Sequence, residues 1–167
     1  MLPDPLHPAV IHLPIALAVL IPGFAALSIY LIHKEFLPSR SWGAIVLLQA
    51  LLVGSAWIAL ETGEREEDRV ERVVAESHIE THEEAAERFF VFAWIGLVAI
   101  AAGLLPARMG TVSRAVGTVA SLGVLAAAVY VGHFGSELVY RYGAATAYVD
   151  GPGAAGSARS DEHFDDD

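Results

Sequence analysis

The chain has 167 residues, no cysteine and a formal net charge of −10, and 54% of its residues are hydrophobic. This composition is too apolar for an ordinary soluble domain, and the lack of cysteine excludes disulfides, thiolate metal sites, cysteine-ligated iron–sulfur clusters and covalently attached haem. Because the charge is strongly acidic, there is no basic face to neutralise phosphates, which excludes a nucleic-acid partner.

Four segments without Asp, Glu, Lys or Arg each supply the roughly 20 apolar residues that a helix needs to cross a bilayer. No basic residue precedes the first segment, so we expect it to remain in the mature protein rather than act as a signal peptide. The predicted fold is all-α: an integral-membrane, four-helix up-and-down bundle over residues 1–148, followed by a flexible acidic tail at 149–167. The helices are expected at about 9–33, 41–60, 66–105 and 113–136.

The first predicted helix is preceded by His7 and begins near His12, which shares a stripe at helical spacing with three small residues, Ala16, Gly23 and Ala26. In the second, Trp42 and Trp57 are typical of interfacial anchors. Gln49 should face the bundle interior and bond to another helix. Gly63 is expected to end this helix.

The third helix is predicted to resume at about Glu66, so that it begins outside the bilayer and continues inward without a break. One stripe of this helix carries His78 and His82 above Gly96 and Gly103. The fourth helix places His133 in line with two alanines, Ala126 and Ala115. Histidines from three helices would therefore gather at one membrane face, where ionisable groups are costly and usually functional.

The connections after the first and third helices are short and basic, and carry Lys34, Arg40, Arg108 and Arg114. By the positive-inside rule they face the cytoplasm, which places both termini and the acid-rich 61–88 stretch on the opposite side.

Four motifs come in a familiar order: HPAVIHLPIAL, ETG, THEEAAERF and GHFGSELVYRYG. Together they resemble the bacterial family called domain-of-unknown-function family 2231 (DUF2231). The resemblance implies a four-helix protein of the bacterial inner membrane. Some relatives carry Rieske or cytochrome c domains, which implies that the protein works with redox proteins and binds a b-type haem. The motif histidines fall on His7, His12, His82 and His133. The family's usual Gly-Gly pair is replaced by Gly135-Ser136 in this chain. The serine makes a close approach of another helix backbone at position 136 less expected.

Haem iron without thiolate takes axial imidazoles, often from two helices of a bundle. His12 and His82 are the first predicted pair, with His133 and His7 as alternates; Arg88 and Arg141 would pair with haem propionates or with Glu84 and Glu137. A non-haem zinc, copper or iron site is the alternative, because His78 and His82 lie four residues apart. Its ligands would come from four histidines: His12, His82, His133 and His78. The remaining interpretation is that these residues are interfacial histidines, hydrogen-bonded to backbone carbonyls and lipid headgroups, and bind no cofactor.

The leading functional hypothesis is a membrane electron-transfer protein that holds haem b near the periplasmic face. Its acidic stretch would dock a soluble or membrane cytochrome, or a larger redox complex. The alternative is a cofactor-free accessory subunit whose histidines stabilise an interface or sense pH. No hydrolase or phosphate-loop signature occurs, so an enzyme is not expected. Homo-oligomerisation is left open.

Overall fold

The computed structural model describes residues 5–148, and the predicted tail at 149–167 lies outside them. The described chain is helical and has no strand. Its elements are α1 (His7–Val10), α2 (His12–His33), η1 (Ser39–Trp42), α3 (Gly43–Val70), α4 (Glu76–Ala101), η2 (Ala102–Leu104), α5 (Ala107–Tyr140) and η3 (Ala144–Tyr148).

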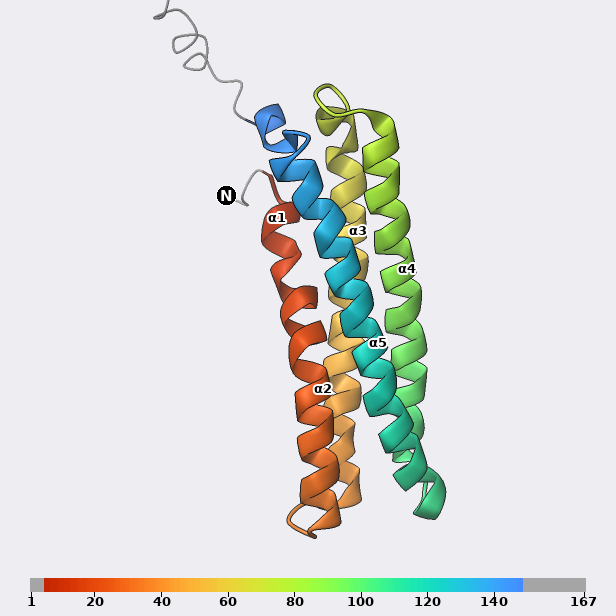
Figure 1. The fold of residues 1–167 in the computed structure, drawn as a ribbon. Coiled ribbons are helices and arrows are strands. Elements are labelled where there is room, and N and C mark those ends of the chain that lie inside the picture. The colour runs from red at the N-terminus through yellow and green to blue at the C-terminus, as the bar shows by residue number, and fades with distance from the viewer. Residues whose placement is uncertain (1–4, 149–167) are drawn as a thin grey trace, which may run out of the picture.

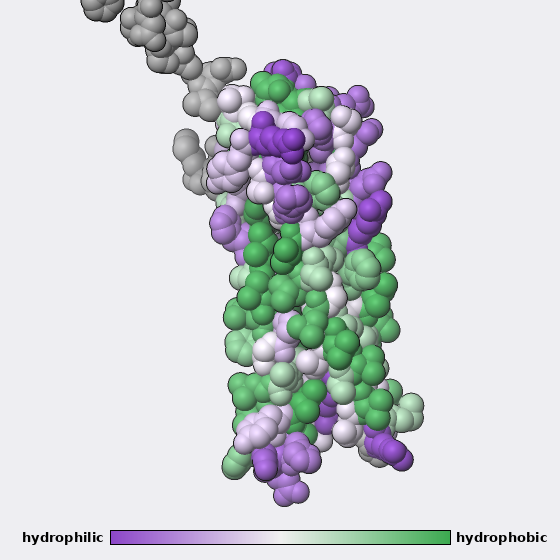
Figure 2. Space-filling view, in the orientation of Figure 1, coloured by the Kyte–Doolittle hydropathy of each residue, from purple (hydrophilic) through white to green (hydrophobic). Residues whose placement is uncertain are grey.

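The four long helices run up and down side by side, as predicted (Figure 1). Within the described residues, four helical stretches are long and apolar enough to cross a membrane: His7–His33, Ser39–Val70, Glu76–Leu104 and Arg108–Tyr140. Figure 2 shows an apolar band around the bundle with polar caps at both ends. We call the end with Lys34, Arg40, Arg108 and Arg114 the basic end. The other, which holds α1, the α3–α4 turn and the end of α5, is the acidic end.

A break at Ile11 separates α1 from α2 and reflects Pro14, which has no N–H to donate to the carbonyl four residues earlier. Pro22 also lies inside α2 and is buried among the other helices. The predicted single helix over 9–33 therefore consists of two collinear helices, α1 and α2.

The predicted boundary between the second and third helices is wrong. α3 continues through Gly63 to Val70, and α4 begins only at Glu76, ten residues later than expected. Gly63 does not end the helix, because its backbone keeps a negative φ; a Cβ there would lie in contact with the His7 ring, at 3.4 Å. The 34 residues of α5 span about 51 Å against about 30 Å of hydrocarbon. The second and fourth helices thus extend beyond the apolar band as well as the third.

The main core runs along the bundle axis and is completed by Gln49, which is fully buried. Gln49 donates Nε2–H to the Ala93 carbonyl on α4 at 3.0 Å, which confirms the predicted interhelical bond. Gly96 of α4 makes room for this amide, since a Cβ there would lie 3.0 Å from Nε2. A second, smaller core at the acidic end joins four residues, Val74, Ile79, Leu138 and Ala144.

The interpretation of Trp42 as an interfacial anchor is wrong. Its side chain is fully buried at the basic end and donates Nε1–H to the Ile100 carbonyl at 2.8 Å. The indole packs directly over Gly103, where any Cβ would collide with it. Trp57, by contrast, is 56% exposed on the apolar band, as an anchor should be.

Candidate functional site

His7 ties the N-terminal segment to α3. Its Nδ1 donates to the Ala59 carbonyl at 2.9 Å and lies 3.3 Å from the Thr62 hydroxyl. The backbone N–H groups of Leu6 and His7 both donate to Oε1 of Glu66, at 2.8 and 3.0 Å. Because a carbonyl oxygen can only accept, Nδ1 of His7 carries the proton, and Nε2 of the neutral ring is left with its lone pair.

His82 enters the bundle interior from α4. Its Nδ1 is buried and has no hydrogen-bond partner among the described residues. The ring also lies near the Val131 carbonyl of α5. The ring packs against Gly135, where a Cβ would lie 3.1 Å from Cε1. A buried nitrogen lone pair without a partner costs free energy unless a proton, water or ligand occupies it.

A positive charge on the His7 ring would act on the His82 ring, so the two histidines lie in the same region of the acidic end. We call these two residues the His7–His82 pair. The His7 ring donates one N–H to a backbone carbonyl and keeps the other nitrogen as a lone pair, which is how metal-ligating histidines are usually oriented. His7 packs against α3 and His82 packs against α5, so the two residues help to join the helices at the acidic end.

His12 and His133 lie on the surface and not with this pair. His12 is exposed and its Nδ1 contacts the Ala9 carbonyl of the preceding turn at 3.3 Å. The stripes on which both histidines were placed also face outward, since their small residues are exposed: Ala16, Gly23 and Ala26 on α2, and Ala115 and Ala126 on α5. Only the stripe on α4 faces the interior.

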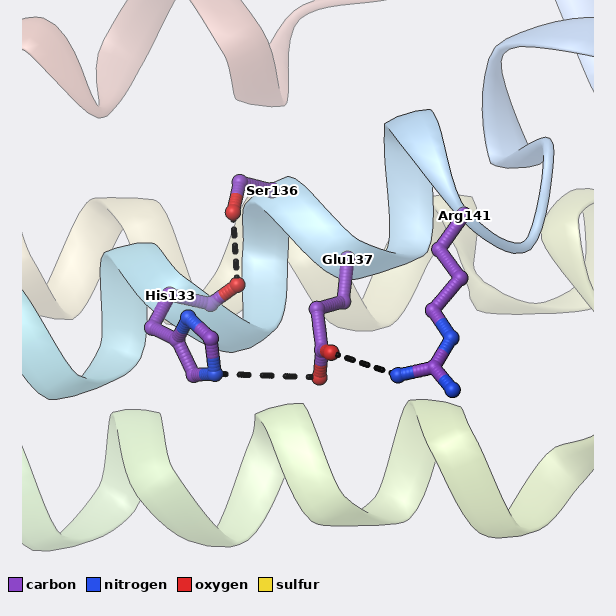
Figure 3. Close-up of polar contacts among 4 residues, drawn as sticks. All are labelled: His133, Ser136, Glu137 and Arg141. Carbon is purple, nitrogen blue, oxygen red and sulfur yellow. Dashed lines mark hydrogen bonds and ion pairs between the residues drawn. The ribbon is translucent and has the colours of Figure 1, made fainter.

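His133 belongs to a row of charged side chains on α5 (Figure 3). Its Nε2 lies 3.9 Å from Glu137, which also accepts a hydrogen bond from Arg141 at 3.0 Å. Arg88 pairs in the same way with Glu84 at 2.9 Å. Both arginines thus have carboxylate partners on their own helices, the simpler of the two predicted arrangements.

Ser136 replaces the second glycine of the family's Gly-Gly pair, and no other helix of the described chain packs closely against it. It is exposed, and its hydroxyl donates to the His133 carbonyl at 2.7 Å. The close approach occurs one residue earlier, at Gly135.

His78 stacks on Tyr142, with ring centroids 3.7 Å apart. It therefore faces a groove between α4 and the end of α5, which lies beside the His7–His82 pair and not in it. In residues 5–148, no group of three or more His, Cys, Asp or Glu side chains is placed to hold a metal ion. Any cation at this end would take at most two imidazoles of the described chain.

Sequence reasoning missed three residues that hold His7 and the N-terminal segment in place: Thr62, Glu66 and Tyr148. Thr62 is buried, and its hydroxyl donates to the α3 backbone. Glu66 accepts from two backbone N–H groups and from the Tyr148 hydroxyl at 2.8 Å. The acid-rich composition around Glu66 concealed it; its spacing of four residues from Thr62 on one helical face was the available signal.

Replacing Glu66 by alanine should release the N-terminal segment without unfolding the bundle. The loss of two charge-assisted bonds lowers the free energy of local opening by about 2 kcal/mol, so the Leu6 and His7 amides should exchange hydrogen roughly 30-fold faster. Hydrogen exchange with mass spectrometry measures this. Asp68→Ala, at an exposed residue of the same helix, is the control; equal exchange in both variants would contradict the role of Glu66.

Replacing Gly135 by valine should destabilise the acidic end, because the added atoms must displace the His82 ring. Overpacking of this kind costs about 1–3 kcal/mol. Thermal unfolding in detergent would show it as a lower midpoint than that of Gly132→Val, which has no neighbour within 4 Å of its Cβ position. Indistinguishable midpoints would rule out the close contact between α5 and His82.

The fold defines an all-helical membrane protein with four candidate membrane spans. The chain belongs to the DUF2231 family, described as a predicted membrane protein, whose model matches residues 3–148. No curated protein and no solved structure is similar enough to match.

Proposed function

We propose that this chain is a membrane electron-transfer protein that holds a redox-active metal, as b-type haem or as a single ion, at the His7–His82 pair. The observation that carries the proposal is the buried Nδ1 of His82, which has no hydrogen-bond partner among the described residues and lies within electrostatic range of a second imidazole, that of His7. Burying such a nitrogen is unfavourable in a purely structural role and useful in a ligand.

The donor set fits the chemistry of the group. Two neutral imidazoles suit haem iron, copper or zinc, and without thiolates they are the strongest ligands available in this chain. A bound haem or copper ion would supply one-electron redox chemistry. The close packing of His82 on Gly135 and of His7 on Gly63 accommodates a small ion more readily than a porphyrin. A haem between these rings would require α1 to move away from α3.

The other predicted ligands hold a secondary place in this proposal. His12 and His133 face outward, so they could bind haem or metal only at a contact with another chain. His78 is engaged with Tyr142. We therefore prefer His82 and His7 to the pair His12 and His82.

We further propose that the acidic end lies in the periplasm of a bacterial inner membrane, with both termini there. The basic connections at the opposite end support this orientation. Exposed acids on α3 and α4, among them Glu64, Asp68 and Glu80, would steer a basic partner such as a soluble cytochrome toward the pair.

Optical and magnetic spectra of the full-length protein test the proposal. The protein would be purified in detergent from cells supplied with iron, copper and haem precursor, and compared before and after dithionite. A Soret band with an α-band that sharpens on reduction would identify haem, and a copper electron-spin resonance that disappears on reduction would identify an ion. A protein with neither signal would contradict the proposal.

A second function, a cofactor-free accessory subunit of a membrane complex, is favoured by one specific observation. The contacts of His7 with Ala59, Thr62 and Glu66 are complete without any ligand, and they fasten the N-terminal segment to the bundle. This function predicts co-purification with a larger complex and no spectral change with dithionite.

A further inference from the structure

A cavity of about 490 Å³ opens at the basic end, opposite the His7–His82 pair. It lies between η1 and the connection from η2 to α5. Two arginines, two hydroxyl side chains and three apolar residues line it: Arg40, Arg114, Ser39, Thr111, Leu104, Leu105 and Pro106. The combination of cations and hydroxyls with an apolar wall indicates an amphipathic, anionic ligand.

Arg114 is the most informative residue of this cavity because it is only 7% exposed. Its Nε donates to the Gly103 carbonyl at 2.9 Å, which fixes the guanidinium and leaves its two terminal amino groups for another acceptor. Within residues 5–148, no carboxylate lies within ion-pair distance of Arg40 or Arg114. Arginine stays charged in proteins, and a buried charge without a counter-charge is strongly unfavourable. An anion in the cavity would supply that counter-charge.

We propose that this cavity binds a phosphate group, and that the source is the headgroup of an anionic phospholipid. Arg114 and Arg40 present planar guanidinium groups, which match phosphate oxygens in paired hydrogen bonds. Ser39 and Thr111 add hydroxyl donors. Pro106 lines the cavity as the N-cap of α5, whose first turn has no side-chain cap, so its free N–H groups add to the attraction for an anion.

The position of the cavity favours a lipid over a soluble phosphate. Its lining residues belong to the connections at the basic end, and Figure 2 shows that the apolar band gives way to polar residues at each end of the bundle, where headgroups would lie. Leu104 and Leu105 would contact the glycerol and the first methylenes of the chains. Basic pockets between helices are known to hold anionic headgroups in this way. Glu35 is the only acid in the two connections at this end, so little opposes the anion.

Native mass spectrometry of the full-length protein in detergent tests the site. Phosphatidylglycerol would be titrated against phosphatidylcholine. We expect preferential binding of phosphatidylglycerol, and about tenfold weaker binding in Arg40→Gln and Arg114→Gln. Arg108→Gln, which removes a charge from the same end but not from the cavity, should bind within twofold of the unsubstituted protein. Equal binding of the two lipids, or unchanged binding in Arg40→Gln, would overturn the proposal.

Two additions keep the test decisive. Arg40 is exposed, so Arg40→Gln leaves the fold intact even if Arg114→Gln does not. Inorganic phosphate is then added to the lipid-bound protein: lipid that stays bound supports the headgroup as the ligand. Displacement at millimolar phosphate, lost in Arg40→Gln, supports the phosphate site but assigns it to a soluble source.

Discussion

Replacing His82 by alanine is expected to abolish cofactor binding while leaving the bundle folded. Among residues 5–148, the substitution removes the one buried side-chain nitrogen without a hydrogen-bond partner, so a metal or haem iron would lose its best-placed ligand. Even partners that only orient a ligand cost 10–100-fold in metal affinity when removed, so we expect a loss of roughly 100-fold or more. The measurement is the metal or haem retained per chain after purification, with circular dichroism to confirm the helices.

The companion variants distinguish the two predicted ligand pairs. His7→Ala should also lose the cofactor, whereas His12→Ala and His78→Ala should keep it, because those rings lie outside the pair. Loss in His12→Ala with retention in His7→Ala would instead support haem held by His12 and His82.

Replacing Trp42 by alanine is expected to give the largest loss of stability. The fully buried indole of η1 packs over Gly103 of η2, and its Nε1–H satisfies the Ile100 carbonyl of α4. Truncation of a buried Trp costs about 3–5 kcal/mol through lost contacts and a residual cavity. Unfolding in detergent followed by circular dichroism measures this loss.

Trp57 provides the matched control, because it is on α3, which follows Trp42 directly in the chain, and is 56% exposed. Trp57→Ala should cost less than about 1 kcal/mol. If both variants unfolded alike, Trp42 would have to be at the surface, as its place near a helix end suggested.

The four spans could be predicted from the sequence because uncharged runs of this length have few other structures available. The interior position of Gln49 followed from the cost of an unpaired amide in hydrocarbon. These predictions depend only on the hydrophobicity of each segment and on its length, and both can be read from a single sequence.

The helix ends at Gly63 and Glu76 could not be predicted in the same way. A glycine ends a helix only where the chain needs a positive φ, and Gly63 instead keeps a negative φ beside a histidine 56 positions earlier in the chain. The turn that does end α3 carries no glycine or proline signal.

The candidate site shows a related limit. Small residues on one side of a helix predict a contact face, yet Ala16 and Gly23 are exposed, while the buried side of α2 carries larger residues such as Leu17 and Ile21. In a membrane the lipid-facing side is as apolar as the core, so hydrophobic periodicity does not tell the two sides apart. On α4 the charged outer extension breaks that symmetry, and the inward position of His82 was predicted.

Elemental analysis of the purified full-length protein most directly tests the claim that the His7–His82 pair binds a metal. The unsubstituted protein should carry close to one iron or copper per chain, and the double variant with alanine at both positions should carry none. A metal-free unsubstituted protein, or equal metal in both proteins, would contradict the claim.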